Sequence, residues 1–253
     1  MSTHVPALAG IARGLLDFAL PPACAVCSGL VSRDGAGLVC DVCWARILTL
    51  GAPRCERCGH PLAHPKHRCR WCPLLPPFVR AVRSVAWVPG GAAGGIVHAL
   101  KYDGWHGVAH EMAARMARLA WPDDVVRERA ALVAVPLAST RLRERGFNQS
   151  EMLARALAPR WCVEVLDGVV ERTRSTDSQT RLTPEQRLRN VSGAFRTTPG
   201  AAARLDGMHI VLVDDVVTTA ATLNECAAAL MHGGARIISY VTFGRARTDA
   251  DRS

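Results

Sequence analysis

Eight cysteines between residues 24 and 72 constrain this chain more than any other feature of its sequence. They form four C-x-x-C pairs, which are Cys24/Cys27, Cys40/Cys43, Cys55/Cys58 and Cys69/Cys72. Two intervening residues let a tight turn place both sulfurs of a pair on one tetrahedral ion at ~2.3 Å. A disulfide scaffold would need an oxidising compartment, and a redox C-x-x-C would normally occur once. The pattern therefore predicts a zinc module, a duplicated four-cysteine ribbon that holds two ions.

Such zinc would be structural, because four thiolates leave no coordination position for a substrate or water. The sequence does not settle which pairs share an ion. With eight cysteines sufficient, we expect the nearby His60, His64 and His67 to lie on the surface. Trp44 and Trp71 stand beside ribbon cysteines, where they could stack on nucleic-acid bases or form the small cores of the ribbons.

Charge and hydropathy limit the remaining classes of protein. Eight thiolates and two zinc ions would reduce the formal net charge of +9 to about +5, a modest excess for a nucleic-acid-binding protein. No apolar run approaches the ~20 residues that a membrane span needs. The first 20 residues lack the basic start of a secretion signal, so we expect a short packing helix there and a cytoplasmic protein.

After Pro73 the chain changes to apolar runs that alternate with helical patterns, which indicates a parallel α/β sheet. Strands are expected over 79–88 and 130–138, followed by a basic loop and a helix that begins near Asn148. A later segment reads as strand, loop, helix and strand, with Gly233 and Gly234 as a left-handed helix end. We expect a helix over 1–20, a double ribbon over 21–75, an α/β domain over 76–247 and a polar tail over 248–253.

The segment HIVLVDDVVTTAATL carries the clearest chemistry of the α/β part. Asp214 and Asp215 end a buried strand, where their carboxylates could accept hydrogen bonds from ribose hydroxyls. Thr218, Thr219 and Thr222 lead into a helix whose free N–H groups could bind an anion. Together these residues predict a ribose-5-phosphate site. Alternatively, Asp215 caps the helix and the threonines bond the local backbone.

Two polar stretches add to this prediction. Arg141, Arg143 and Arg145 precede Gly146 after a strand, and guanidinium groups on such a loop suit a pyrophosphate; the alternative is a solvated basic turn. Residues 172–195 are unusually polar and contain a capping box over 183–186, which favours a lid over a phosphorylated ligand.

These motifs together resemble the ComF family, in which a double zinc ribbon precedes a type I phosphoribosyltransferase domain. The carriers are the four cysteine pairs, HALKYDG (98–104), VPL with RLRERGFNQ (135–149), residues 172–195 and VLVDDVVTTAATL (211–223). The resemblance implies that Asp214 and Asp215 hold the ribose hydroxyls of phosphoribosyl pyrophosphate. It also implies a 5-phosphate cradle made of Thr218, Thr219, Ala220, Ala221 and Thr222. Arg141, Arg143, Arg145 and Gly146 would lie near the pyrophosphate with Mg²⁺, and 172–190 would form a hood.

Two positions raise separate questions. Lys101 is a further candidate for ligand or nucleic-acid contact, unless it is an ordinary surface lysine. The family's phosphate loop usually reads T-T-G-A-T, whereas Ala220 stands here in place of the glycine. If the φ angle at this position is positive, alanine costs roughly 1 kcal/mol or more and weakens binding. If the loop needs only close approach, binding survives.

The resemblance implies an accessory protein of competence or DNA uptake. Its phosphoribosyltransferase domain would bind phosphoribosyl pyrophosphate, and its ribbons would contact single-stranded DNA or a competence helicase. DNA contact would then depend on Arg54, Arg57, Arg68 and Arg70. The alternatives are an active transferase with an unknown acceptor and a ligand-sensing regulator without DNA contact. No histidine among His98, His106 and His110 declares itself as a catalytic base, and the oligomeric state stays open.

Overall fold

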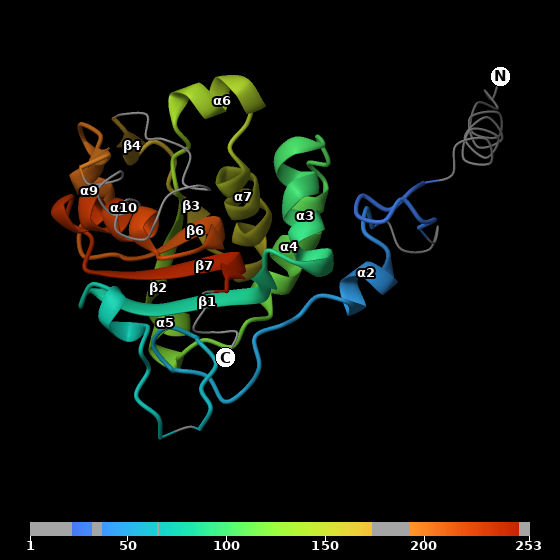
Figure 1. The fold of residues 1–253 in the computed structure, drawn as a ribbon. Helices are drawn as coiled ribbons and strands as arrows, with labels where there is room; N and C mark the ends of the chain where they lie inside the picture. The colour runs from blue at the N-terminus through green and yellow to red at the C-terminus, as the bar shows by residue number, and fades with distance from the viewer. Residues whose placement is uncertain (1–21, 32–36, 65, 174–192, 248–253) are drawn as a thin grey trace, which may run out of the picture.

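The computed structural model describes residues 22–31, 37–64, 66–173 and 193–247. Within these ranges the main sheet has five parallel strands in the order β1-β7-β6-β2-β3 (Figure 1). The strands are β1 (Val79–Val88), β2 (Arg129–Ala134), β3 (Glu164–Val165), β6 (His209–Val217) and β7 (Ile237–Ala246). A small antiparallel pair consists of β4 (Val170–Arg172) and β5 (Phe195–Thr197). The parallel α/β sheet is thus as the alternation of apolar runs predicted.

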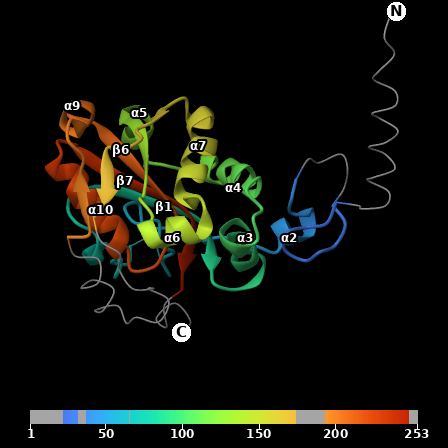
Figure 2. The same ribbon diagram turned by 90° about the horizontal axis from the view of Figure 1, so that it is seen from above.

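Helices cover both faces of the sheet, which explains why its strands are apolar on both sides (Figure 2). One face packs against α3 (Gly91–Tyr102), α4 (Val108–Ala117) and α7 (Gln149–Trp161). The other packs against α9 (Ala201–Leu205), α10 (Ala221–His232) and the β4–β5 pair. The shorter helices are α2 (Asp41–Ala45), α5 (Asp123–Glu128), α6 (Ser139–Arg145) and the 3-10 turn η1 (Cys72–Leu74).

Three local expectations need correction. The strand expected over 130–138 ends at Ala134, two residues before Pro136. The basic loop after it is instead the short helix α6, which ends at Gly146 in the left-handed conformation with φ 81°. At the end of α10 Gly233 has an ordinary φ of −81°, and Gly234 alone of the two has a positive φ, 106°.

Backbone of the zinc module lies along the outer edge of β1, from the segment between the two cysteine groups and from the second group. The Trp87 N–H donates to the Leu48 carbonyl at 2.8 Å, and the Val82 N–H donates to the Arg57 carbonyl at 2.8 Å. Thr49 also forms an antiparallel bridge with Ala86. This edge of the sheet is therefore covered by backbone from the zinc module, which removes a row of exposed strand donors and acceptors.

Several predictions lie outside the described residues. They are the helix over 1–20, the tail over 248–253, the capping box over 183–186 and most of the predicted hood. Across the part of the chain that the structure describes, no helix combines the length and the apolar character that crossing a membrane requires.

Candidate functional site

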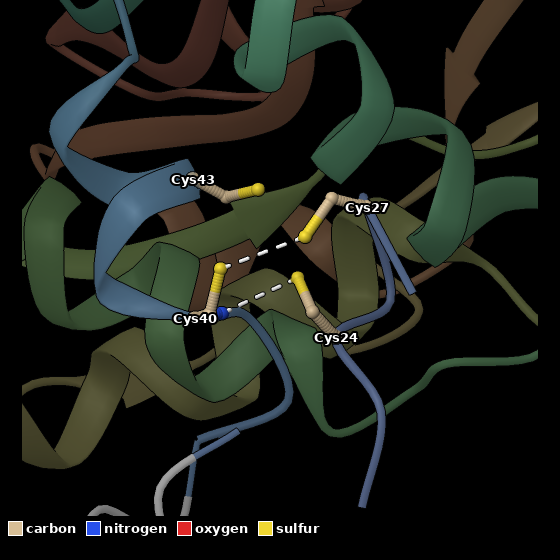
Figure 3. Close-up of side chains that lie close together, drawn as sticks. All are labelled: Cys24, Cys27, Cys40 and Cys43. Carbon is tan, nitrogen blue, oxygen red and sulfur yellow. Dashed lines mark hydrogen bonds between the residues drawn. The ribbon is translucent and has the colours of Figure 1, made fainter. Parts of the chain in front are cut away.

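The eight cysteines form two groups in space, each made of consecutive pairs. The first tetrad is Cys24, Cys27, Cys40 and Cys43, and the second tetrad is Cys55, Cys58, Cys69 and Cys72. Within each tetrad all four sulfurs lie within 4.8 Å of one another (the first in Figure 3). Sulfurs bound to one tetrahedral zinc would stand about 3.8 Å apart, as follows from Zn–S bonds of ~2.3 Å. The Sγ atoms of Cys27 and Cys40 are 3.7 Å apart, and those of Cys55 and Cys72 are 3.3 Å apart. The tetrads therefore fit two structural zinc ions.

The turn after each leading cysteine pair has the backbone that such a site needs. Ser28 and Gly59, which follow Cys27 and Cys58, have φ angles of 58° and 67°. In the first tetrad the backbone N–H groups of Val26 and Cys40 point at the Cys24 sulfur, at 3.4 and 3.3 Å (the Cys40 contact in Figure 3). N–H donors directed at sulfur stabilise the thiolate form that binds metal.

Trp44 anchors the first tetrad on the face of the sheet that α3, α4 and α7 cover. This side chain is 8% exposed, and its ring meets that of Phe243 edge-on, with centroids 6.1 Å apart. The Trp44 Nε1–H donates to the Glu111 carboxylate at 2.9 Å, and the Leu38 N–H donates to the other carboxylate oxygen. The guanidinium carbon of Arg115 lies 3.2 Å from the ring centroid. Trp44 is thus a core residue of the ribbon interface, and base stacking is not available to it.

The second tetrad packs with the core on the other face of the sheet, which α9 and α10 cover. Arg245 on β7 donates to the carbonyl of the ligand residue Cys58 at 2.5 Å. Arg57 donates to the carbonyls of Cys72 and Pro76, at 3.3 and 2.6 Å. His60 is 9% exposed and packs against Trp71 and Trp87, so its expected place on the surface is wrong. His64 and His67 are exposed, as expected.

A cavity of about 690 Å³ opens at the carboxyl ends of β2 and β6, the end of a parallel sheet where α/β proteins bind ligands. Of the predicted ligand-binding residues, eight line it: Lys101, Arg141, Asp214, Asp215, Thr218, Ala220, Ala221 and Thr222. Four others lie outside its lining: Arg143, Arg145, Gly146 and Thr219. The fold thus brings together side chains from α3, α6, β6 and the start of α10.

The two adjacent acids have different partners. Asp215 is 3% exposed, forms an ion pair with the Lys101 ammonium and accepts a hydrogen bond from Gln149 Nε2 at 3.1 Å. Asp214 is half-buried and accepts a hydrogen bond from Ser150 Oγ at 2.7 Å. The Asp215 N–H also donates to Asp214, at 2.9 Å. Lys101 is therefore not an ordinary surface lysine, because it is the counter-ion of a buried carboxylate.

These surroundings separate the proton affinities of the two acids. Burial and the adjacent charge of Asp215 raise the pKa of Asp214 to about 7, although the Ser150 hydrogen bond opposes this. Burial also acts on Asp215, but the Lys101 ammonium and the hydrogen bonds from Lys101 and Gln149 lower its pKa below the ordinary value. At neutral pH Asp215 is therefore ionised, whereas Asp214 is protonated in a substantial fraction of the molecules.

Arg145 reaches this acid pair indirectly. Its Nη1 donates to Gln149 Oε1 at 2.6 Å, which directs the Gln149 amide nitrogen toward Asp215. Its guanidinium also lies 5.0 Å from the centroid of the exposed Tyr102 ring. Arg145 orients a residue of the pocket from outside its lining.

In the loop from Thr218 to Thr222, alanine stands at a position where the backbone has a positive φ angle. Ala220 has φ 63° and ψ 6°, the left-handed conformation, and is the residue that precedes α10. Its carbonyl accepts a hydrogen bond from the Asn224 N–H at 2.7 Å. Alanine in this conformation is strained by about 1 kcal/mol relative to glycine.

Sequence reasoning missed Gln149 and Ser150. Both are buried in the first turn of α7, after Asn148 caps that helix by accepting from the Ser150 N–H at 3.1 Å. A cap residue followed by two buried polar side chains is a signal of function, but burial is visible only in the fold. His98 and Tyr102 also line the cavity without having been predicted to do so, and Arg172, the first residue of the predicted hood, lines it too.

Comparison with known proteins identifies both parts of the chain. Residues 15–73 match the double zinc ribbon domain, and residues 145–253 match the phosphoribosyl transferase domain. The DNA utilization protein YhgH of Salmonella typhimurium is 34% identical over 228 residues, which cover 87% of this chain and 95% of that protein. Competence protein F of Haemophilus influenzae is 33% identical over 117 residues, covering 46% of this chain and 50% of its own.

Among solved structures, a glutamine phosphoribosylpyrophosphate amidotransferase from B. subtilis aligns with a TM-score of 0.36 and 15% identity, over 54% of this chain and 26% of that one. The sheet and the two domain matches define a protein with a double zinc ribbon and a phosphoribosyltransferase fold. The chain belongs to the ComF family, with YhgH and competence protein F as relatives, as its motifs predicted.

Proposed function

We propose that this protein binds phosphoribosyl pyrophosphate with Mg²⁺ in the cavity between α3, α7 and α10. We further propose that it serves DNA utilisation or competence in the cytoplasm. One observation supports the ligand more than any other: an acid pair with separate partners and a threonine-rich helix start line the same cavity. The names of YhgH and competence protein F support the process.

Each part of the ligand has a matching group. The carboxylates of Asp214 and Asp215 would accept hydrogen bonds from the ribose hydroxyls. The hydroxyls and N–H groups of 218–222 would bind the 5-phosphate at the start of α10. Arg141 and Lys101, which line the same cavity, would face the pyrophosphate.

Mg²⁺ would neutralise charge on the pyrophosphate when bound. Carboxylate oxygen is the protein ligand that Mg²⁺ prefers. Asp214, which is half-buried in the cavity wall, is the acid that would join the phosphates in holding it. Asp215 would keep its ion pair with Lys101 and its hydrogen bond from Gln149 while it accepts from a ribose hydroxyl, and so would fix the geometry of the acid pair.

Two of the four ribbon arginines that the sequence suggested for contact with DNA or a protein partner bond the ribbon itself instead. Arg54 donates to the carbonyls of Gly51 and Leu50, and Arg57 donates to four carbonyls around η1 and β1. These two arginines support the ribbon itself. Lys66, Arg68 and Arg70 are exposed on the second ribbon and would meet a phosphate backbone.

An active transferase is the second candidate, and one observation favours it. His98 and Tyr102 line the same cavity as the acid pair and are both exposed, so an acceptor could lie against them. Catalysis would then come from orientation and from stabilisation of the developing positive charge on the ribose. Release of pyrophosphate in the presence of a panel of bases and amines would favour transfer, and no release across the panel would favour a sensing role.

Calorimetric titration with phosphoribosyl pyrophosphate and Mg²⁺ tests the ligand. We expect heat with the wild-type protein and a loss of about tenfold or more in affinity for Asp215→Asn, which removes the charge and keeps the shape. Arg143→Ala is the matched control, because Arg143 is exposed and lies outside the cavity lining. No heat with the wild-type protein would overturn the ligand proposal.

Fluorescence anisotropy with a single-stranded oligonucleotide tests the DNA contact. The double variant Arg68→Glu/Arg70→Glu should weaken binding and reduce the dependence of the binding constant on salt. Arg118→Glu/Arg127→Glu makes the same change of charge on exposed residues at the ends of α4 and α5. Equal losses in both variants would show a general effect of charge and would contradict a ribbon site.

A further inference from the structure

Asn224 connects the second tetrad with the phosphate loop. The 3-10 turn η1 begins at Cys72, the last cysteine of that tetrad, and ends at Leu74. The Leu74 carbonyl accepts a hydrogen bond from Asn224 Nδ2 at 2.9 Å, although the two residues are 150 positions apart. One side chain therefore links a metal-binding turn to helix α10.

The same asparagine is fixed on its other side. Its Oδ1 accepts a hydrogen bond from the Tyr240 hydroxyl at 3.1 Å, and Tyr240 is fully buried. Its backbone N–H donates to the Ala220 carbonyl at 2.7 Å. A carbonyl can only accept, so the Leu74 bond determines which way the amide faces. The bond to Ala220 is the first helical hydrogen bond of α10, so the residue held by Leu74 and Tyr240 lies one helical turn after the left-handed residue of the phosphate loop.

Zinc bound by the second tetrad would help to fix the position of the Leu74 carbonyl, which lies two residues after Cys72. The cysteines of the second tetrad other than Cys58 are only partly buried, so the ribbon has little core of its own. A metal must supply the folding energy of such a module. Arg57 donates to the carbonyls of Cys72 and Leu75, at 3.3 Å each, and so fixes the turn between them relative to the tetrad. Loss of the ion would release η1 and with it the acceptor of Asn224.

We propose that zinc in the second tetrad sets the affinity of the phosphate loop through Asn224, which acts as a positioning residue. The binding part of this inference rests on the proposed phosphoribosyl pyrophosphate site. Coupling between two sites is reciprocal for binding free energies, so the bound ligand must also raise the affinity of the second tetrad for zinc. The first tetrad supplies an internal comparison, because it is anchored to α4 through Glu111.

Zinc release to a chromogenic chelator tests the coupling on the full-length zinc-loaded protein. With phosphoribosyl pyrophosphate and Mg²⁺ present, one of the two ions should leave about fivefold more slowly, and the other should be unaffected. In Asn224→Ala that protection should disappear, and the dissociation constant of the ligand should rise about fivefold. Glu111→Gln also removes one hydrogen bond between a ribbon and the body, and it should leave both values as in the wild type.

Hydrogen exchange at the amides of 218–224 tests the link without any ligand. Exchange there should be faster in Asn224→Ala and in wild-type protein after zinc removal. Asn224→Asp keeps an acceptor for Tyr240, and its ionised carboxylate cannot donate to Leu74, so it should have the same effect if the alanine variant folds poorly. Unchanged exchange in these variants overturns the inference whether or not the ligand binds. Absent ligand binding with altered exchange counts against the proposed function alone.

Discussion

The Lys101 ammonium at the end of α3 pairs with the Asp215 carboxylate on β6, in a wall of the cavity where Asp215 is almost fully buried. The pair joins two elements that are far apart in the sequence. Burial, followed by the charge of Asp215, raises the pKa of the neighbouring Asp214 to about 7, and the charge of Lys101 opposes this shift. The pair therefore contributes both to the local stability and to the charge that a ligand meets.

Removing both members of this pair should cost less than the two single removals added together. Lys101→Met leaves a buried carboxylate without its counter-ion, and we expect a loss of about 3 kcal/mol in the free energy of unfolding. The double variant Lys101→Met/Asp215→Asn should lose less than the sum of the single changes, as urea unfolding of zinc-saturated protein would measure. Lys66→Met, at an exposed lysine of the second ribbon, should stay within about 0.5 kcal/mol of wild type. Additive single effects would contradict a direct interaction.

Glycine at position 220 should make the folded protein more stable. Ala220 holds a φ of 63°, so Ala220→Gly removes strain and should raise the free energy of unfolding by up to about 1 kcal/mol. If 218–222 bind the 5-phosphate, affinity should rise as well. Ala221→Gly is the comparison one residue later, inside α10, where glycine is unfavourable and should not stabilise. A lower stability for Ala220→Gly, measured by thermal and urea unfolding, would refute the assigned strain.

Two glycines with nearly equal φ angles separate conformational strain from steric contact. At Gly59, with φ 67°, a Cβ atom would lie 2.5 Å from the Val82 carbonyl oxygen of β1. At Gly168, with φ 66°, a Cβ atom would meet nothing within 4 Å. Gly168→Ala should cost about 1 kcal/mol, whereas Gly59→Ala should cost more and loosen the second ribbon. Zinc content per chain, measured after dialysis against a weak chelator, should fall toward one for Gly59→Ala and stay at the wild-type value for Gly168→Ala.

Asp214 should give the stability a defined dependence on pH. Its pKa is about 7 in the folded protein against an ordinary value of 3.8, so the folded state keeps a proton that the unfolded chain has lost. The free energy of unfolding should therefore fall as the pH rises from about 4 to about 7, with a limiting slope of ~1.4 kcal/mol per pH unit for one proton, and then level off.

The variant Asp214→Asn isolates this contribution. It should lack the fall, whereas Asp167→Asn, at an exposed acid, should retain it. Comparing variants at the same pH and with zinc in excess cancels the pH dependence of metal binding. Parallel curves for wild type and Asp214→Asn would show that Asp214 titrates normally.

Short sequence patterns predicted the features of this molecule that depend on residues close together in the chain. The cysteine spacing predicted two tetrads because each ligand pair is made within one turn. The alternation of apolar runs predicted a parallel sheet because each strand is buried on both faces. Asp214, Asp215 and Thr218 could be predicted to lie together because a strand end and the following helix start are contiguous in the sequence, and all three line the cavity.

The remainder depends on contacts between distant residues. Gln149 and Ser150 donate hydrogen bonds to Asp215 and Asp214, which lie 66 and 64 positions away in the sequence. Neither a glutamine nor a serine in a sequence indicates which distant residue it will bind. His60 is buried because a second ribbon folds against β1, which ribbon spacing alone does not reveal. The sequence raised the question of Ala220, but only backbone geometry gives the sign of its φ angle.

The position of β1 has a consequence for synthesis on the ribosome. One edge of this strand is bound by Leu48 and Arg57, which are made before it, and the other pairs with β7, which is made almost last. If the ribbons fold first during synthesis, β1 would lie against them with its inner edge open until β7, about 150 residues later in the sequence, is made. Chains that stop before Ile237 would carry an unpaired apolar strand, and we expect such fragments to aggregate or be degraded.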